Sequence, residues 1–500
     1  MASLLEVMDF GNEAGDEVRG KDLAPFFVEQ KQFQQFLDDR NRILVATAKK
    51  GVGKSALIQW LGYRIQETNP DDVVVKLRGA DLSRAKFGLT NELKNPNDHI
   101  QDWMVRLCTV VNRNLAKKLK LALADDSITL IEAAEIDGYR ERNLVRCLMD
   151  RFTKVIPRLD ASKQQINNEL EILKRANPKN VWILIDDLDA TFQNTDQECL
   201  ELSSFFSACR YLIQDIDGIT IRATMRTDVW PIIRRFDEAL DKMKQYIRDI
   251  RWSEDDFRSL LARRIRHQMA EQGIQYKEPP KHVHKQDIEI QLIERAFVPR
   301  MPWGNDGREN YTYRVIFTLS YHRPRWAIQL CKAAQQDAVA HHENHIGRNN
   351  IDNVWGEYGK QRIEDLIAEH KHQVREVEEL INSFRGAQRL MSRDELMAWV
   401  NNHVTTHLRP RIEGDLVTSP VQVAQFLYRI GFLQARSQDK DGNYEHYGYD
   451  EMPDFLASRT NDDFGVSWEI HPCYRQALDI VKLDRAQRIK KGLIRERNRF

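Results

Sequence analysis

The sequence lacks an apolar run long enough to cross a membrane. A membrane-spanning helix needs roughly 18 or more consecutive apolar residues, and no run of that length is present. The first residues, MASLLEVMDFGNEAGDEV, also lack the basic start and the apolar stretch of a secretory signal. These absences predict a soluble, cytoplasmic protein that has no membrane partner.

Cysteine is scarce, and an excess of charge of one sign is missing. The six cysteines are scattered and form no C-x-x-C pair, which argues against a zinc site or a disulfide framework and favours reduced, buried thiols. Lys and Arg total 75, as do Asp and Glu, so the formal net charge is zero. The chain as a whole therefore indicates no polyanionic partner, and any argument for nucleic acid rests on local patches.

The length of 500 residues exceeds one ordinary hydrophobic core and predicts roughly two to four domains. Changes in composition and periodicity along the chain indicate where the parts begin and end. We expect a flexible lead-in at 1–24, an α/β core at 25–252 with a helical insert at about 97–175, a helical lid domain at 253–385, a winged-helix-like domain at 386–481 and a basic tail at 482–500.

Apolar runs that alternate with helical periodicity predict a parallel sheet with flanking helices in the α/β core. The run at 181–185 is continuously apolar, as expected for a central strand that is buried on both faces. The expected strands are 43–46, 73–77, 181–185 and 219–225, and the expected helices are 55–66 and about 196–214.

The C-terminal part changes character. Two helical stretches precede a hairpin around Asp441-Gly442, and a short strand at 467–470 follows. This order of helix, helix and hairpin is typical of a winged helix. In the helical lid domain, the aromatic and glycine-containing stretch at 301–313 is expected to be a loop.

A glycine-bearing turn between the first expected strand and the helix after it matches the Walker A pattern, with Ala48 in place of the usual first glycine. Gly51 and Gly53 allow backbone N–H groups to curl around phosphate oxygens. Lys54 is expected to reach the β- and γ-phosphates of ATP, and the Ser55 hydroxyl to bind Mg²⁺. The alternative, a chance Gly/Lys loop, is disfavoured by the strand and the helix on either side. The expected nucleotide-binding residues are Ala48, Lys49, Lys50, Gly51, Val52, Gly53, Lys54, Ser55 and Ala56.

Acidic residues follow the apolar strand at 181–185. Asp186 is the expected second Mg²⁺ ligand, together with Ser55. Asp187 is the expected group that polarises the attacking water, and its short side chain predicts slow turnover. Asp189 either supports one of these acids or caps the next helix. The alternative for the pair, a solvated acidic turn, requires two linked motifs to arise by coincidence.

Arginines are the candidates for sensing the γ-phosphate. Arg226 follows the strand at 219–225, and its alternative role is an ion pair with Asp228. Arg325 begins a helix of the lid domain, where it either touches the nucleotide or simply belongs to a helix N-terminus that has Pro324 in its first turn. The candidates for an arginine finger that acts on a neighbouring subunit are Arg234, Arg235, Arg248 and Arg251.

Together these motifs resemble the additional-strand, AAA+-related branch of P-loop ATPases, and more narrowly bacterial STAND- and KAP-like ATPases, which are frequent in phage-defence gene neighbourhoods. The resemblance implies an ATP-driven switch or assembly platform that forms homo-oligomers or holds an effector protein encoded nearby. Membrane helices, which KAP proteins often carry, and the terminal repeats of STAND proteins are not found. The segments that resemble these families span about residues 25–340 and are FFVEQKQF, AKKGVGKSAL, ILIDDLDATF, MRTDVW, IRWSEDDFRSLLARRI and HRPRWAIQLCKAA.

Two further groups of residues have competing interpretations. His341, His342 and His345 lack the partner motif of a zinc protease, which favours a solvated helix face over a metal site. The tail at 482–500 holds eight basic residues and two acidic ones, and it can contact nucleic acid, dock on an acidic partner or stay solvated. No N-K-x-D motif is present, so ATP is preferred over GTP, and the missing LSGGQ motif counts against an ABC-type engine.

The sequence therefore predicts an Mg²⁺-dependent hydrolase that converts ATP and water to ADP and phosphate. One hypothesis is a signalling or anti-phage defence ATPase whose nucleotide state controls oligomerisation or a partner effector. A second is a DNA-binding ATPase that loads or remodels proteins on DNA through the winged helix and the basic tail. A third is an inactive scaffold that only binds nucleotide.

Overall fold

The computed structural model describes residues 4–84, 96–107 and 180–482, apart from gaps at 14, 16, 71, 101, 104–105, 193, 216–217, 235, 237, 277–279, 281, 305–307, 439–443 and 457–464. Most of the expected helical insert at 97–175 and nearly all of the basic tail lie outside these residues. The chain divides into two compact units: residues 12–256, and residues 1–11 together with 257–500. Within the described residues, no helix is long and apolar enough to span a membrane.

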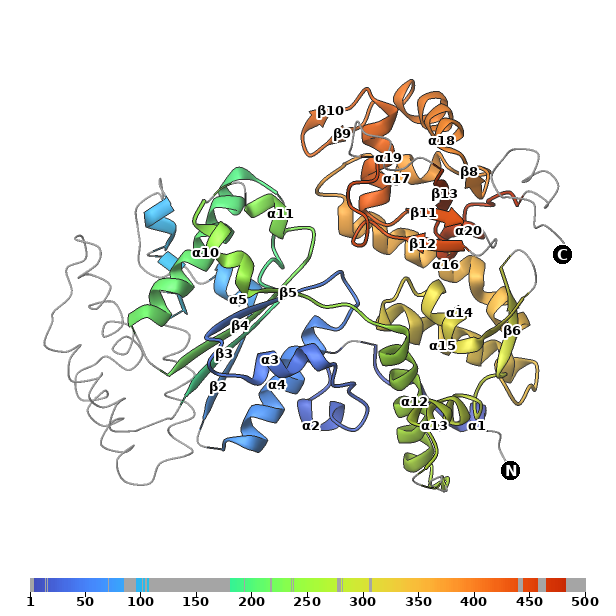
Figure 1. The fold of residues 1–500 in the computed structure, drawn as a ribbon, viewed down its shortest axis with the longest axis horizontal. Helices are drawn as coiled ribbons and strands as arrows, with labels where there is room; N and C mark the ends of the chain where they lie inside the picture. The colour runs from blue at the N-terminus through green and yellow to red at the C-terminus, as the bar shows by residue number, and fades with distance from the viewer. Residues whose placement is uncertain are drawn as a thin grey trace, which may run out of the picture. The chain divides into compact units, whose positions relative to one another are not determined.

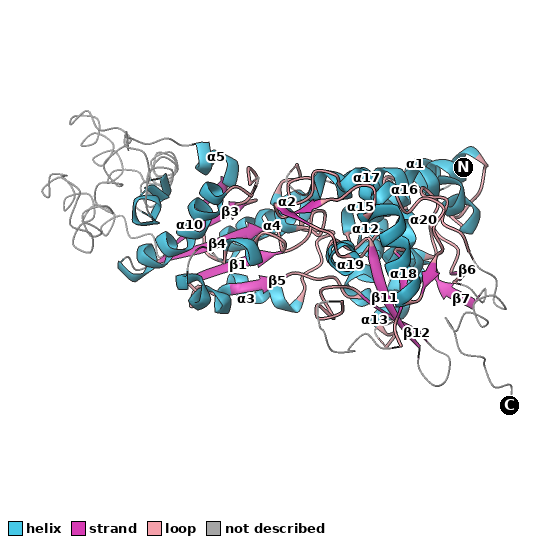
Figure 2. Ribbon diagram, turned by 90° about the horizontal axis from the view of Figure 1, so that it is seen from above, coloured by secondary structure: helices cyan, strands magenta, loops and turns pink. Residues whose placement is uncertain are grey.

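One sheet of five parallel strands forms the centre of the unit of residues 12–256 (Figure 1). The strand order is β2-β3-β4-β1-β5, and Figure 2 shows β3, β4, β1 and β5 side by side in that sequence. β4 therefore lies between β1 and β3, as the additional strand does in the branch of P-loop ATPases that the sequence resembles. The strands are β1 (Ile43–Thr47), β2 (Val73–Arg78), β3 (Val181–Asp186), β4 (Ile219–Met225) and β5 (Ile247–Asp249).

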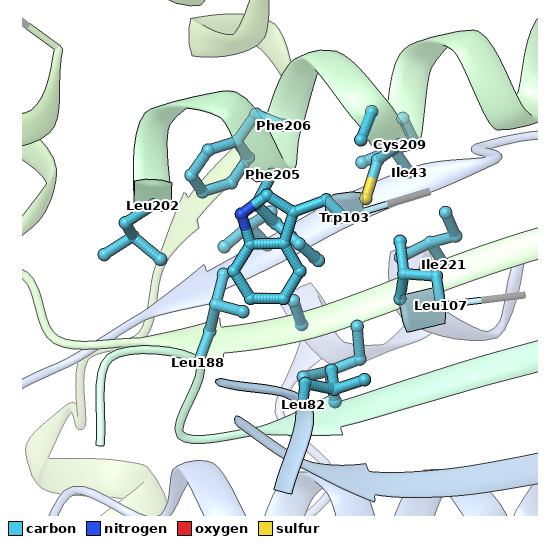
Figure 3. Close-up of a cluster of buried hydrophobic side chains, with 14 of the residues drawn as sticks. Ile43, Leu82, Trp103, Leu107, Leu188, Leu202, Phe205, Phe206, Cys209 and Ile221 are labelled. Atoms are coloured by element: carbon cyan, nitrogen blue, oxygen red, sulfur yellow. The ribbon is translucent and has the colours of Figure 1, made fainter. Parts of the chain in front are cut away.

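Helices cover both faces of this sheet, so alternate residues of each strand enter different cores. Leu44 of β1 and Trp182 of β3 pack with α4 on one face, whereas Ile43 and Ile183 pack with α10 on the other. On the α10 side, Trp103 lies among apolar side chains that include Leu188 and Phe205 (Figure 3). The helices of this unit are α2 (Gly20–Leu23), η1 (Lys31–Phe33), α3 (Gln34–Leu37), α4 (Lys54–Thr68), α5 (Gly79–Arg84), α10 (Asp196–Asp215), α11 (Trp230–Ile233) and η2 (Glu238–Tyr246).

Four of the five strands coincide with the expected ones, but β5 does not. Its three residues, Ile-Arg-Asp, contain no apolar run, and they form a strand because they pair with the end of β1. Tertiary pairing thus decides the conformation of a segment whose own sequence is not typical of a strand.

Helices dominate the other unit up to about residue 382. The stretch at 301–313, expected to be a loop, holds an antiparallel hairpin of β6 and β7 followed by α14. The loop prediction is wrong here because cross-strand side chains pair: the Arg300 guanidinium lies over the Tyr311 ring at 4.3 Å. The elements are α1 (Leu4–Val7), α12 (Glu254–Glu271), α13 (Lys285–Ile293), β6 (Arg300–Trp303), β7 (Arg308–Tyr311), α14 (Thr312–Leu319), α15 (Pro324–Ala340), α16 (Arg348–His370) and α17 (Val377–Asn382).

Residues 4–11 pack in this helical unit instead of forming the loose lead-in that the sequence predicts. Phe10 is only 1% exposed, and the Gln335 side chain donates hydrogen bonds of 2.7 Å to the carbonyls of Leu5 and Met8. The segment is too short for its apolar residues to show a periodicity, so its burial was not foreseeable from the pattern alone.

The last part of the chain has the order of a winged helix. An antiparallel sheet has the order β12-β11-β13-β8. The helices α18 and α19 contact this sheet and each other. β11 and β12 pair on either side of the expected turn at Asp441-Gly442, which itself lies outside the described residues. The elements are β8 (Leu390–Met391), α18 (Arg393–Val400), η3 (Asn401–Thr405), β9 (Arg411–Ile412), β10 (Asp415–Leu416), α19 (Pro420–Arg429), β11 (Leu433–Gln438), β12 (Tyr444–Tyr447), β13 (Ser467–Ile470) and α20 (Pro472–Arg475).

Candidate functional site

The expected phosphate loop leaves the end of β1 and turns into the first turn of α4. Ala48 is buried, and its N–H donates to the Met225 carbonyl of β4 at 3.2 Å. Gly51 and Gly53 have φ values of 81° and 112°, a left-handed backbone that glycine adopts without strain. A Cβ added at Gly53 would meet no atom within 4 Å, so the space in front of the loop is open there. No side chain caps α4 at Gly53, and helix N-termini of this kind bind anions.

Lys54 folds back into the loop that it follows. Its ammonium group donates to the Ala48 carbonyl at 3.4 Å and lies 3.8 Å from the Asp187 carboxylate. The Lys54 side chain is only 7% exposed. A cation is thus held inside the curl of the backbone, which is where the predicted contact with phosphate requires it. Among the other loop residues, Val52 is buried, Lys50 is exposed, and Lys49, Ser55 and Ala56 are half-buried.

Asp186 and Ser55 come together beside Lys54, as the predicted pair of Mg²⁺ ligands requires. Burial raises the pKa of the Asp186 carboxyl above its ordinary value, and the charge of Asp187 adds to this effect. Hydrogen bonds with Thr224 and Ser55, and the charge of Lys54, act in the opposite direction. These contacts offset only part of the cost of burying the charged carboxylate. A nearby cation would stabilise its charged form further.

Thr224 of β4 positions both acids, and sequence reasoning missed it. Its hydroxyl donates to an Asp186 carboxylate oxygen at 2.8 Å and accepts from the Asp187 backbone N–H at 2.8 Å. The side chain is fully buried. The available signal was its place: a hydroxyl on the last residue but one of β4, a mostly apolar strand that neighbours β3.

Asp187 has a φ of 45°, an unusual left-handed conformation for a residue other than glycine. The hydrogen bond from its N–H to Thr224 holds this turn. Its carboxylate is 52% exposed and faces Lys54, so it is open to solvent, whereas Asp186 is half-buried. The two acids therefore have different environments, as different roles demand.

Asp189 and Arg226 contact each other near Lys54 of the loop. One Asp189 oxygen accepts from the Arg226 backbone N–H at 3.2 Å, and the other lies 3.9 Å from the Arg226 guanidinium. Burial raises the pKa of Asp189 to about 6, opposed by the charges of Lys54 and Arg226. Arg226 itself forms a bidentate ion pair with Asp228. The structure thus has the alternative contact for Arg226, and sensing of a phosphate by this residue stays a prediction.

Trp252 contacts the phosphate loop, and sequence reasoning also missed this role. Its indole N–H donates to the Val52 carbonyl at 2.7 Å, and the ring packs against the core that contains Val52 and Ile58. The sequence signal was a single aromatic residue between a short strand and a helix start, which does not distinguish this role from ordinary packing.

The other described arginine candidates of the α/β unit contact residues outside the phosphate loop. Arg234, Arg248 and Arg251 contact Asp241, Gln35 and Asp249 respectively, and Arg235 lies outside the described residues. Arg325 belongs to the other unit, in the first turn of α15 after Pro324. The finger and sensor assignments therefore stay predictions.

The donor groups at the loop fit ATP and Mg²⁺. Backbone N–H groups at a helix start and a buried lysine suit phosphate oxygens, while a serine hydroxyl and a carboxylate are the hard oxygen ligands that Mg²⁺ prefers. The residues that would hold the metal are Ser55 and Asp186, and the metal would supply charge neutralisation between the phosphates.

The histidine cluster has no such arrangement. His341, His342 and His345 are exposed and follow the end of α15, so they lie in a turn and not on the helix face that was expected. The His341 ring nitrogen contacts the Asp337 carbonyl at 2.8 Å. Among the described residues, no group of three or more metal-binding side chains is found.

A family model matches part of the helical unit, and its match does not include the phosphate loop. The family described as the FunZ-associated C-terminal helical domain matches residues 255–367, which run from the start of α12 into α16. A search of curated protein sequences finds no match.

Several solved structures are similar to this chain. The Aeropyrum pernix ORC2 protein, solved as ADPNP-ADP complexes, shares 11% identity over 89% of this chain and 90% of that chain, with a TM-score of 0.40. The Thermotoga maritima RuvB Holliday junction branch migration motor shares 12% over 90% and 99%, with a TM-score of 0.30. Drosophila ORC bound to DNA shares 8% over 94% of each chain, with a TM-score of 0.29. The strand order and the glycine loop of residues 12–256 are those of a P-loop NTPase fold.

Proposed function

We propose that this chain is an ATP-binding and ATP-hydrolysing molecular switch. The observation that carries the proposal is the meeting of Lys54, Ser55 and Asp186 at one end of the parallel sheet, beside a glycine loop that starts a helix. Two separate sequence segments, the loop with the start of α4 and the end of β3, supply the backbone donors, the cation and the metal ligands that phosphoryl transfer requires. The alternative, a solvated acidic turn without function, would not need this combination.

In this proposal each residue has a defined task. The loop and Lys54 hold the β- and γ-phosphates, Ser55 and Asp186 hold Mg²⁺, and Asp187 orients the attacking water. Asp187 suits the last task because its carboxylate is half exposed while its backbone is fixed by Thr224. The fixed turn and the short side chain limit how close the carboxylate comes to a water molecule, which predicts slow turnover.

The proposed output is a change in assembly. Slow hydrolysis gives a long-lived ATP state, and a switch needs two states that persist long enough for a partner to distinguish them. The partner is a second copy of the chain or an effector protein. The anti-phage defence setting comes from the sequence resemblance, and the proposed cytoplasmic location comes from the scattered cysteines.

The alternative of a DNA-binding ATPase is less well supported by the charges. Residues 386–481 contain nine Lys and Arg and fourteen Asp and Glu, a formal charge of −5. α19, the second helix of the winged-helix-like region, carries one basic residue, Arg429, and its guanidinium pairs with Glu413 at 2.8 Å. Phosphate binding is favoured by an excess of basic residues, whereas acidic residues are in excess at 386–481.

The mass in solution tests the switch. Asp187→Asn should bind ATP without consuming it, and we expect it to shift to a larger assembly with ATP and Mg²⁺ but not with ADP. Lys54→Ala should stay at the mass of the nucleotide-free protein under all conditions. An Asp187→Asn protein that binds ATP at unchanged mass, with and without the candidate partner, would rule out control of assembly.

A further inference from the structure

The chain passes between its two compact units twice. Residues 1–11 belong with 257–500, whereas residues 12–256 form the other unit. One passage therefore follows Gly11, which has a φ of 82°, and the other lies in the first turns of α12. On the α/β side, both passages begin close to the phosphate loop.

The passage into α12 is attached to the loop by hydrogen bonds. The Trp252 indole donates to the Val52 carbonyl at 2.7 Å, and the Ile250 N–H donates to the Thr47 carbonyl, at the end of β1, at 2.8 Å. Ser253 then caps α12, since its hydroxyl accepts from the Asp256 N–H at 3.1 Å. A single residue thus separates the loop contact from the first residue of an 18-residue helix.

The passage after Gly11 touches the loop helix directly. A Cβ added at Gly15 would lie 2.8 Å from both the Cβ and the backbone nitrogen of Ala56. Ala56 is in the first turn of α4, two residues after Lys54. Only glycine allows this close approach of the two backbones.

We infer that Trp252 is a positioning residue of the phosphate loop, and that it passes a shift of the loop on to α12. The inference rests on the proposed function, because it needs nucleotide at the loop. The Val52 carbonyl cannot move without stretching its bond to the indole or moving Trp252, and Trp252 is joined to the cap of a rigid helix. Gly15, in the passage that follows Gly11, contacts the first turn of α4. Both passages between the units therefore respond to a shift of the phosphate loop.

The test compares full-length Trp252→Phe with Trp355→Phe. Phenylalanine keeps an aromatic ring at position 252 but removes the N–H donor together with part of the indole ring, and the control variant loses the same atoms. Trp355 is the matched control, because its indole also donates to a backbone carbonyl, that of Pro472 at 3.1 Å, but in the other unit. Affinity for ATP with Mg²⁺ is measured by calorimetry, and hydrogen exchange of residues 250–257 is measured with and without nucleotide.

We expect Trp252→Phe to bind ATP roughly two- to tenfold more weakly, the loss that one net hydrogen bond produces. At saturating ATP, it should also lose the nucleotide-dependent change in exchange at 250–257 that the wild type and Trp355→Phe show. Unchanged affinity together with an unchanged exchange response would overturn the inference. If the wild type itself does not bind ATP, the proposed function fails as well, so the two failures are distinguishable.

A second pair of variants uses the other passage. Gly15→Ala should weaken ATP binding because it pushes against the first turn of α4. Gly20→Ala is the control: its added Cβ would lie 2.5 Å from the Gln59 carbonyl, an equally crowded place on α4 that lies further from the loop. Equal losses of affinity in both variants would show that crowding on α4 alone is responsible and would contradict a specific link through Gly15.

Discussion

At the scale of single residues, the proposed site pairs acids with groups that fix their positions. Asp186 and Asp187 are adjacent in sequence, yet the first is half-buried and the second is exposed. Thr224 connects them through two hydrogen bonds of 2.8 Å. A buried hydroxyl that serves two partners is costly to remove, because both lose a bond at once.

Thr224→Val tests this role. Valine has nearly the same shape, but it leaves the Asp187 N–H and the Asp186 carboxylate without their shared partner. We expect ATP turnover to fall by about tenfold or more, with a higher Mg²⁺ concentration needed for half-maximal rate. Thr220→Val, at the other end of the same strand and also buried, is the control. Equal turnover in both variants would argue against a positioning role for Thr224.

Asp189 gives a pH-dependent prediction. Burial raises its pKa from the ordinary 3.8 to about 6, so the folded protein holds this proton more tightly than the unfolded chain. The resulting stabilisation is present below about pH 4 and is lost as the pH rises through 6. Asp189→Asn should therefore stabilise the protein at pH 7.5, by up to about 3 kcal/mol, and by about half as much at pH 5.

Thermal melts at the two pH values provide the measurement. Asp241→Asn is the control, since the Asp241 side chain is 77% exposed and its replacement should change little at either pH. A gain in melting temperature that is equal at pH 5 and pH 7.5, or a loss at pH 7.5, would show that burial of the Asp189 charge does not limit stability.

At the scale of elements, the sequence predicted what long apolar runs and the loop motif determine. β3 and β4 are apolar enough to be recognised as strands, and the pattern at Gly51–Ser55 is specific to phosphate-binding loops. β5 and the β6–β7 hairpin were not predicted, because their strand character depends on pairing and on contacts such as Arg300 with Tyr311. Thr224 and Trp252 were missed for a related reason: a hydrogen bond across the fold leaves no spacing pattern in the chain.

The N-terminal segment is an element whose importance the sequence understated. Phe10 is buried in the unit that contains residues 257–500, so Phe10→Ala should destabilise that unit by roughly 3–5 kcal/mol. Val7→Ala, at a residue that is 37% exposed, should cost far less. Calorimetric unfolding of the two variants compares them directly, and equal effects would mean that residues 4–11 contribute no buried core.

At the scale of the whole molecule, two compact units predict two unfolding transitions. ATP with Mg²⁺ should raise only the transition of residues 12–256, by an amount that grows with nucleotide concentration as RT ln(1 + [L]/Kd). Phe10→Ala should lower only the other transition. Differential scanning calorimetry across ATP concentrations checks both statements. An equal shift of both transitions by ATP would contradict binding confined to the α/β unit.

The central claim is that the loop and the two acids hydrolyse ATP, and ATP turnover by the full-length protein tests it most directly. The wild type is compared with Lys54→Ala and Asp187→Asn, and with Asp196→Asn as a control in the first turn of α10. The account predicts slow, Mg²⁺-dependent turnover in the wild type and the control, none in the other two, and retained ATP binding in Asp187→Asn. Turnover that survives in Lys54→Ala or Asp187→Asn, or a wild type that neither binds nor hydrolyses ATP, would contradict it.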